Sequence, residues 1–496
     1  MINHLPILPI LIPALTGALL LLPILQRSMR QQRLVSLGAT LLTLVAAIAL
    51  YNGSTEVTTH YLLGDWEQPF GIVLVADRLS TLLVLLTAVL SLGVVIYANA
   101  GTDEAGSFFH PLFQYQLMGI YGAFLTGDMF NLFVFFEILL LASYGLLVHS
   151  GGKTRIRASV QYVTLNLIGS ALFLVALGLL YGTLGTLNMA QMAERVALMR
   201  EDQLVLLEAA LLILVVVFGL KTALVPLQFW LVRSYAAATA PVAALFAIMT
   251  KVGIYGFYRI HIGTFGHQPE LGGGLMQTLF WVMAAATMLV GIIGVLGSKN
   301  LRTLTANLVL ISVATLMFTV ALGSEAAVSA GLYYLIHSTL VTAALFLLAD
   351  IIAHKRGPAA DNFVPARPMR QRSLMSITFM VIAITAVGMP PMSGFIGKTL
   401  ILVSAQTGSQ QLVAWTFILV GSLAALIGLS RAGTSLLWHT TGSKAPAETT
   451  SALPMAALML FTLSAPAMVL FAGPLTDTLA LAAGQLVTSA TEVALQ

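Results

Sequence analysis

The chain has 496 residues, of which 58% are hydrophobic and only 8% are charged, and its net charge is +4. Soluble domains carry roughly 25% charged residues, so this composition excludes an ordinary soluble protein and indicates a membrane protein. There is no cysteine, which excludes disulfides, thiolate metal sites and cysteine-ligated iron–sulfur clusters.

Apolar residues fall in runs of about twenty, long enough to cross a hydrocarbon core of about 30 Å as helix. Runs such as LLILVVVFGL (211–220) lack the alternation that barrel strands require. We therefore predict an all-α polytopic membrane protein with about 14 transmembrane helices. The predicted spans, in chain order, are 5–26, 34–51, 72–98, 108–126, 128–148, 159–182, 205–225, 241–262, 275–296, 303–322, 326–352, 374–403, 411–436 and 452–473.

One segment between spans has a different pattern. NMAQMAERVALMRED (188–202) mixes apolar and charged residues at helical spacing, which predicts a short amphipathic surface helix outside the membrane.

Lysine and arginine residues are distributed unevenly over the predicted loops. Alternate loops carry 16 of the 23, the remaining loops carry 3, and four lie inside or at the edge of spans. Loops rich in Lys and Arg are usually cytoplasmic. The asymmetry predicts that both termini lie outside the cell, and it explains the net positive charge without a nucleic-acid partner.

A short motif occurs twice within apolar runs. FGLKT (218–222) and FIGKT (395–399) share F-x-x-K-T, and proline lies close to each copy. Pro226 follows the first copy, and two prolines precede the second. Proline cannot donate the helical hydrogen bond to the residue four back, so we predict broken helices in the seventh and twelfth spans.

These prolines release particular backbone carbonyls. The carbonyl of Thr222 lies beside the first lysine, and those of Ala386 and Val387 precede the second. The two spans are five apart, so a five-helix repeat must be inverted in the membrane, and broken helices at matching positions of inverted repeats point to an ion site. The alternative is a chance match in a chain rich in Leu, Gly and Thr.

Five ionisable side chains lie near membrane depth in the predicted spans. A charged residue at the centre of a membrane helix costs about 2.5 to 3.5 kcal/mol, and such residues usually belong to ion pathways or proton relays. We interpret the five as a candidate proton relay. They are Glu137, Lys221, Lys251, His337 and Lys398.

Each of the five also has a structural alternative. His337 could be a neutral histidine bonded across helices, and Glu137 with Lys221 could be a static ion pair between spans five and seven. Lys398 could extend to the membrane interface. Lys251 has no second buried carboxylate to neutralise it, which makes a purely structural role harder to support. Ordinary anchoring is the interpretation for charged residues nearer to span ends: Asp77, Arg78, Asp128, Glu208 and Asp350.

Nucleotide-binding and metal-binding motifs are absent from the sequence. There is no Walker A motif, no dinucleotide fingerprint after a strand and no H-E-x-x-H, and the longest predicted loops have about twenty residues. We predict no cofactor, no metal and no covalent chemistry. Any energy must then come from an ion gradient or from a partner.

Three stretches carry a family resemblance. TGDMFNLFVFFEILLLASYGLLV (126–148), FGLKTALVPLQFWLVRSYAAATAPVAALFAIMTKVGIYGFYR (218–259) and AVGMPPMSGFIGKTLIL (386–402) resemble the antiporter-like subunits of complex I, membrane-bound hydrogenases and multisubunit Mrp-type Na⁺/H⁺ antiporters. Within that family, NLFVFFEILLLASY and the P-L-x-F-W-L-x-x-S-Y run (226–235) are most similar to the D subunit of Mrp antiporters. Val232 departs from the usual W-L-P.

The resemblance implies fourteen helices with two inverted five-helix bundles. The implied divisions are helices one to three (1–107), a first bundle (108–265), an inverted second bundle (275–436), and a last helix with a tail (437–496). It also implies roles for the five ionisable groups. Glu137 and Lys221 would govern proton uptake, Lys251 would be the central relay, His337 would link two half-channels, and Lys398 would be the terminal group.

The resemblance further implies a proton-translocating subunit of a monovalent cation/proton antiporter in the bacterial plasma membrane. Its partners would be other small hydrophobic subunits, with protons and Na⁺ or K⁺ as the transported ions. The alternative is a proton-pumping subunit of a redox complex such as complex I or a hydrogenase. A stand-alone solute carrier is less favoured because no pocket with substrate-sized polar groups is evident.

Overall fold

The structure is a computed structural model that describes residues 4–54, 58–66, 71–199, 201–266, 274–406, 408–441 and 450–494. Two basic residues used in the orientation prediction, Arg200 and Lys444, lie outside these ranges.

The described chain is almost entirely helical. The elements of the first half are η1 (Leu5–Ile7), α1 (Leu8–Leu20), α2 (Pro23–Gln26), α3 (Met29–Gly53), β1 (Thr59–Leu62), η2 (Leu63–Asp65), β2 (Val73–Ala76), α4 (Arg78–Ala98), η3 (Thr102–Ala105), α5 (Phe109–Leu125), α6 (Met129–Val148), α7 (Lys153–Leu184), α8 (Met189–Ala197), α9 (Glu201–Thr222), α10 (Phe229–Ala237), α11 (Ala240–Phe246), α12 (Met249–Gly256) and η4 (Phe257–Thr264). The second half contains α13 (Leu275–Gly297), α14 (Leu301–Leu322), α15 (Glu325–Arg356), η5 (Gly357–Ala359), α16 (Arg372–Val387), α17 (Ser393–Ser404), α18 (Gly408–Gly433), η6 (Thr434–Trp438), α19 (Ala452–Leu470) and α20 (Ala472–Ala494).

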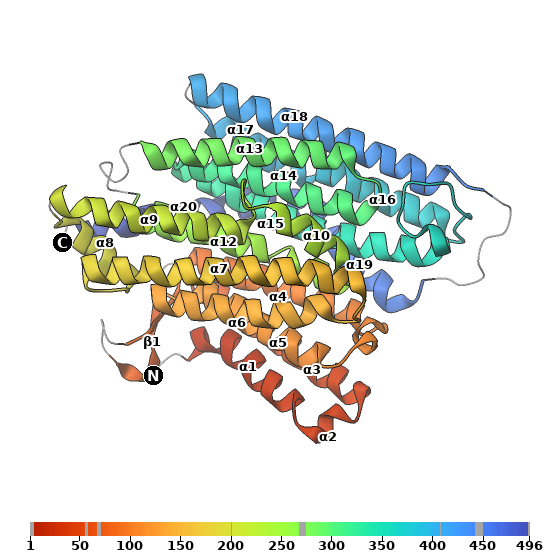
Figure 1. The fold of residues 1–496 in the computed structure, drawn as a ribbon, viewed down its shortest axis with the longest axis horizontal. Helices are drawn as coiled ribbons and strands as arrows, with labels where there is room; N and C mark the ends of the chain where they lie inside the picture. The colour runs from red at the N-terminus through yellow and green to blue at the C-terminus, as the bar shows by residue number, and fades with distance from the viewer. Residues whose placement is uncertain are drawn as a thin grey trace.

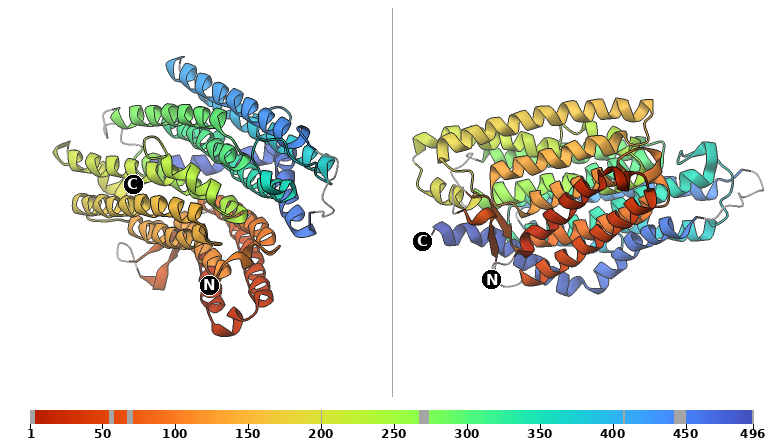
Figure 2. Two further views of the ribbon diagram at one scale, coloured as in Figure 1. Left: turned by 45° about the vertical axis from the view of Figure 1, so that its right-hand side comes forward. Right: turned by 90° about the horizontal axis from the view of Figure 1, so that it is seen from below.

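The long helices lie side by side in one elongated bundle (Figure 1). α1 to α3 form one edge, α18 forms the opposite edge, and α12, α14 and α15 lie between them. The left view in Figure 2 keeps this order, and the right view places α1 to α3 in front of the other helices. α1 begins and α20 ends at the same end of the bundle.

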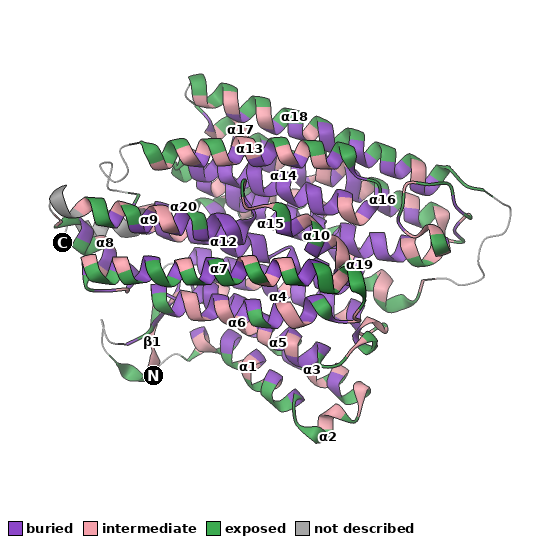
Figure 3. Ribbon diagram, viewed as in Figure 1, coloured by how far each residue is buried: buried purple, intermediate pink, exposed green. Residues whose placement is uncertain are grey.

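Burial separates central helices from outer helices (Figure 3). The apolar windows of Ala240–Thr264, Leu301–Leu322 and Glu325–Ala359 are buried throughout, whereas only 33% of the window is buried in α3, α13 and α19. The outer helices expose large apolar side chains, as a surface facing lipid or partner helices does. The central helices are therefore insulated from lipid by the protein itself.

Eleven helices in the described residues are long and apolar enough to cross a membrane. Leu5–Leu20, Arg372–Val387 and Ser393–Ser404 are also apolar but shorter. These helices confirm a polytopic α-helical membrane protein. The count of fourteen spans stays a prediction.

The structure departs from the expected boundaries at several places. The predicted span 5–26 is divided into η1, α1 and α2, and the predicted span 241–262 is divided into α11, α12 and η4. The run 72–98 begins as strand β2, which pairs antiparallel with β1, so the fold contains one hairpin. α4 starts only at Arg78, because Asp77 and Ser80 form a capping box that fixes the start of the helix. After the last predicted span the chain continues as helix α20, which packs on α15, α8 and η4.

The segment 188–202, predicted as a short amphipathic surface helix, contains the shorter helix α8, and α9 begins already at Glu201. The position of α8 outside the membrane stays a prediction. The buried residues of α8 are Met189, Met192 and Val196, one face of the helix. That face packs against α20 and η4, so α8 ties the end of the chain to the eighth span.

Candidate functional site

The seventh span is broken after its lysine, as predicted. α9 ends at Thr222 and α10 begins only at Phe229. The indole Nε1 of Trp230 donates to the carbonyl of Leu220 at 3.1 Å, and the same carbonyl accepts from the backbone N–H of Ala223 at 3.2 Å. The hydroxyl of Thr222 has no hydrogen-bond partner within the described residues.

The twelfth span is broken before its lysine, also as predicted. α16 ends at Val387 and α17 begins at Ser393. Lys398 Nζ donates to the carbonyl of Val387 at 2.7 Å and to Ser422 Oγ on α18 at 2.8 Å. The sequence predicted that the prolines would release this carbonyl, and the lysine of the same span binds it.

Lys398 is 6% exposed. Its ammonium group is held between α16 and α18, inside the protein, which is the opposite of a side chain that extends to the membrane interface.

Glu137 and Lys221 are joined through a third helix. Glu137 Oε1 accepts a hydrogen bond from Ser170 on α7, and Lys221 Nζ donates to Asn166 Oδ1 on α7 at 3.3 Å. Asn166 and Ser170 are one turn apart on α7 and share a face. The direct ion pair expected from the sequence is therefore replaced by a link through α7, although the charge of Glu137 still acts on Lys221.

A glycine permits the approach of α9 to α7. A Cβ on Gly169 would lie 2.5 Å from Leu220 Cδ2 and 4.0 Å from Lys221 Nζ. Sequence reasoning missed Asn166 and Ser170 because they are uncharged. The available signal was three small or polar residues at positions i, i+3 and i+4 of one apolar span.

Lys251 lies on α12 and is 0% exposed. Its Nζ donates to Ser312 Oγ on α14 at 3.4 Å, and no carboxylate contacts it in the part of the chain that the structure describes. The break in α9 packs directly on this helix, because a Cβ on Gly253 would lie 2.2 Å from Thr222 Oγ1. Lys251 is thus two residues before Gly253, which contacts the last residue of α9, Thr222.

His337 lies on α15 and is 2% exposed. Its Nδ1 is 3.0 Å from Ser393 Oγ, the first residue of α17. A Cβ on Gly394 would lie 3.0 Å from His337 Nε2, so the ring rests against the second broken helix. The charges of both Lys251 and Lys398 act on this histidine.

The five side chains lie on α6, α9, α12, α15 and α17, and the groups that contact them lie on α7, α14, α16, α17 and α18. Glu137 is partly buried and the other four are buried. We refer to the five side chains and these partners as the line. No group of three or more His, Asp or Glu that could hold a metal ion occurs among the described residues. The chemistry that such a line can perform is proton transfer between neighbouring polar groups.

The charged residues expected to be anchors near span ends form polar contacts, and Arg78 Nη1 donates to the carbonyl of Tyr51 at 2.7 Å. Their anchoring role stays a prediction. Asp77 pairs with Arg259 at 2.5 Å and Asp350 pairs with Arg302 at 2.5 Å. Asp128 accepts a hydrogen bond from the backbone of α6. These contacts lie outside the line.

Two broken helices that each carry a buried lysine are typical of ion-translocating membrane proteins. Residues 126–428 match the family described as "NADH:quinone oxidoreductase/Mrp antiporter, TM", and the chain belongs to this family. The relationship predicted from the sequence is confirmed.

Similar curated proteins are antiporter subunits. The chain is 38% identical over 471 residues to the D subunit of a probable K⁺/H⁺ antiporter from Rhizobium meliloti (strain 1021), covering 88% of this chain and 87% of the relative. It is 37% identical over 400 residues to the D subunit of a Na⁺/H⁺ antiporter from Bacillus subtilis (strain 168), covering 80% and 79%.

Solved structures share the whole fold. A chain of the Mrp complex from Dietzia sp. DQ12-45-1b superimposes with a TM-score of 0.87 at 26% identity and 100% coverage of both chains. A chain of respiratory complex I from Thermus thermophilus superimposes with a TM-score of 0.81 at 23% identity, covering 98% and 99%.

Proposed function

We propose that this chain is the proton-translocating D-type subunit of a multisubunit monovalent cation/proton antiporter in the bacterial plasma membrane. The observation that carries the proposal is the line of buried lysines between two broken helices, in a chain 38% identical to the D subunit of an antiporter. The transported ions are protons and Na⁺ or K⁺, and no covalent chemistry is involved.

The proposed architecture has fourteen spans and two inverted five-helix bundles, 108–265 and 275–436, flanked by 1–107 and 437–496. The two helix breaks support it, because Lys221 and Lys398 occupy matching positions of F-x-x-K-T in the two halves. Both lysines are buried, at 5% and 6% exposure.

In the proposed mechanism a proton enters at Glu137 and Lys221, passes to Lys251 and His337, and reaches Lys398. A lysine serves as a relay because its neutral amine accepts a proton and its ammonium donates one. The hydroxyls of Thr222 and Thr250 support the presence of bound water between Lys221 and Lys251. Each is adjacent in sequence to a lysine and has no partner within the described residues, and buried polar groups of this kind usually bind water.

The proposed role of partner subunits is to provide the binding site for the transported cation. The line contains one carboxylate and no cluster of oxygen ligands suited to a hard cation, so a partner subunit is proposed to bind Na⁺ or K⁺. The exposed apolar faces of α3, α13 and α18 offer surfaces for other small hydrophobic subunits.

A redox complex is the second candidate. The likeness to complex I favours it, although at 23% identity that likeness shows the fold alone. Affinity purification of the chain followed by mass spectrometry separates the two. Several small hydrophobic subunits support the antiporter, and flavin or iron–sulfur proteins support the redox complex.

The functional test is Lys251→Ala in the intact complex, assayed as ΔpH-dependent cation/proton exchange in vesicles at matched expression. Loss of a sole proton-transferring group typically lowers the rate about 10²- to 10⁴-fold, and we expect the exchange rate to fall by a factor in that range. Lys299→Ala, which removes an exposed lysine, is the control and should retain exchange. Near-normal exchange in Lys251→Ala would refute the proposed relay.

A further inference from the structure

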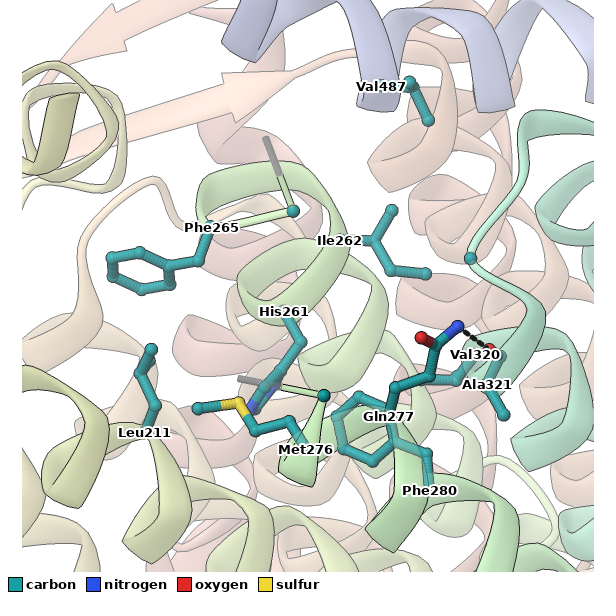
Figure 4. A pocket seen from close by; sticks show the side chains of 13 residues that line it. Leu211, His261, Ile262, Phe265, Met276, Gln277, Phe280, Val320, Ala321 and Val487 are labelled. Atoms are coloured by element: carbon teal, nitrogen blue, oxygen red, sulfur yellow. Dashed lines mark hydrogen bonds between the residues drawn. The ribbon is translucent and has the colours of Figure 1, made fainter. Parts of the chain in front are cut away.

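A cavity of about 370 Å³ lies where η4 ends, between η4, α13 and α14 (Figure 4). Its lining includes His261, Gln277, Phe280 and Val320. A water molecule takes about 30 Å³ of liquid volume, so the cavity has room for a cluster of waters. It lies at the end of the bundle where α1 begins and α20 ends (Figure 1), which is the end predicted to face the outside.

His261 has a buried ring that faces this cavity (Figure 4). The residue is 9% exposed, and neither ring nitrogen has a hydrogen-bond partner in the described chain, although the backbone of Leu211 lies nearby. Gln277 lies on the same wall and donates from Nε2 to the carbonyl of Ala321 at 3.1 Å. A buried imidazole without a partner beside a cavity of this size is a site for ordered water.

Behind the cavity wall, two hydroxyls form a close pair. Tyr258 Oη and Thr319 Oγ1 are 2.5 Å apart. Thr319 directly precedes the lining residue Val320, and Tyr258 is about one turn from His261. At about 1.5 Å of rise per residue, Tyr258 lies about 10 Å and His261 about 15 Å beyond Lys251 along the helix. The pair therefore stands between the cavity and the central lysine.

α14 carries a row of hydroxyls from this pair to Lys251. Ser312, Thr315 and Thr319 lie on one face, and Ser312 Oγ accepts the bond from Lys251 Nζ at 3.4 Å. Thr315 Oγ1 donates to the carbonyl of Ile311 at 2.8 Å. A hydroxyl both donates and accepts hydrogen bonds and can rotate between the two roles, so such a row, with water between its members, can pass a proton.

A glycine on α15 leaves room for the hydroxyl pair. A Cβ on Gly331 would lie 2.2 Å from Tyr258 Oη and 2.5 Å from Thr319 Oγ1. Any larger residue at this position must displace the pair. The packing of η4, α14 and α15 thus leaves space for the hydrogen bond between Tyr258 and Thr319. The line from Glu137 to Lys398 does not include this hydrogen bond.

We propose that this cavity is an outward-facing, water-filled proton port, and that the hydroxyl row of Ser312, Thr315, Thr319 and Tyr258 connects it with Lys251. The ligand is a proton carried by water. The port gives the central lysine its own route to the outer side, separate from the route through His337 and Lys398. This inference rests on the proposed function, because a port is useful only if Lys251 carries protons.

The access test uses the absence of cysteine from this chain. In the intact complex, His261→Cys is treated in whole cells with a membrane-impermeant methanethiosulfonate, and modification of this chain is followed. We expect modification many times faster than at Thr305→Cys, a fully buried position elsewhere on α14. Equally slow modification at both positions, or modification only from the cytoplasmic side, would overturn the port.

The transport test uses two matched threonines of α14. Thr319 and Thr305 are both 0% exposed, and each donates its hydroxyl to a helix carbonyl. We expect Thr319→Val to slow exchange about tenfold, less than the 10² or more for a sole relay group, because the route through Lys398 remains. Thr305→Val should exchange at the normal rate, and Gly331→Ala should behave like Thr319→Val.

Two results separate the port from the relay. If Lys251→Ala abolishes exchange while Thr319→Val matches Thr305→Val, the port is wrong and the proposed function stands. If Lys251→Ala itself retains exchange, the proposed function is wrong and the port falls with it.

Discussion

Lys221 and Lys398 occupy matching positions in F-x-x-K-T but bind different partners. Lys221 donates to the side-chain amide of Asn166 on another helix. Lys398 donates to the carbonyl of Val387, released by the break in its own span. Only Lys221 has a nearby carboxylate, Glu137, whose charge acts on it. The matching lysines of the two halves thus have different hydrogen-bond partners. Such a difference is expected if they lie at opposite ends of a directional path.

The first residue-scale prediction concerns Glu137→Gln. Glutamine retains an oxygen that can accept from Ser170 and removes only the charge, so Lys221 loses its compensating partner. We expect cation/proton exchange in vesicles to fall by about 10²-fold or more, while the complex still assembles. Glu194→Gln, at an exposed position of α8, is the matched control. Near-normal exchange in Glu137→Gln would leave that residue with a structural role.

The sequence predicted which residues form the candidate site better than it predicted their contacts. A charged residue in an apolar run is conspicuous because its burial is costly, so Lys251 and its four companions could be found without a structure. Asn166 and Ser170 could not, since polar uncharged residues are common in membrane helices and the facing direction of α7 depends on packing. The link through α7 is therefore a result of tertiary structure.

At the scale of elements, proline explains the two breaks. Pro226 follows Lys221, and a proline pair lies between α16 and α17. Both breaks could be predicted because the missing donor is a local property. Which side chains donate to the carbonyls near each break could not be predicted, because Trp230 reaches Leu220 from the next helix and Lys398 reaches Val387 across the second break. Likewise the strand at 73–76 was hidden inside an apolar run, since hydrophobicity alone does not separate strand from helix.

An element-scale prediction concerns the contact between α3 and η3. Arg33 Nε donates to Asp103 Oδ2 at 2.6 Å, and His110 Nε2 lies 3.1 Å from the same oxygen. Burial raises the pKa of Asp103, but the hydrogen bonds from Arg33 and His110 outweigh burial and lower the pKa to about 2. A lowered folded-state pKa adds stability above the unfolded value of about 3.9, and this stability is lost as pH falls toward 2.

We therefore expect Asp103→Asn to lower the melting temperature of the purified protein at pH 7. The difference in melting temperature between wild type and Asp103→Asn should become smaller as pH falls from 4 to 2. Glu104→Gln is the control, because Glu104 also contacts Arg33 but is 57% exposed, and exposed pairs contribute little. Melting curves in detergent at pH 7, 4 and 3 measure both effects. An unchanged difference across this pH range would mean that Asp103 titrates normally.

At the scale of the molecule, Lys251 and His337 lie on the central helices α12 and α15. α12, α14 and α15 are wrapped by helices with exposed apolar faces (Figure 3). Sequence alone predicted the membrane class, and the family resemblance implied the bundle order. The packing of α20 back onto α15 and α8 was not predicted. The moderate hydrophobicity of the α20 sequence indicates neither a membrane span nor a loop.

The orientation of the whole molecule is a prediction from its basic residues. β1 and the start of α16 lie at opposite ends of the bundle (Figure 1), so single cysteines at His60 and Arg370 report on opposite sides. An impermeant thiol reagent applied to intact cells should modify His60→Cys, and should reach Arg370→Cys only after the membrane is opened. Modification of both from the same side would contradict the proposed topology.

The central claim is that protons cross this molecule on lysines that gain and lose a proton. Lys398→Arg tests it most directly, because arginine keeps the positive charge but is effectively never deprotonated. In vesicles with the intact complex at matched expression, we expect ΔpH-dependent cation/proton exchange to be impaired in Lys398→Arg almost as strongly as in Lys398→Ala. Lys299→Arg, an exposed control, should exchange normally. Full exchange in Lys398→Arg would contradict the claim, because a permanent charge would then serve as well as a titrating one.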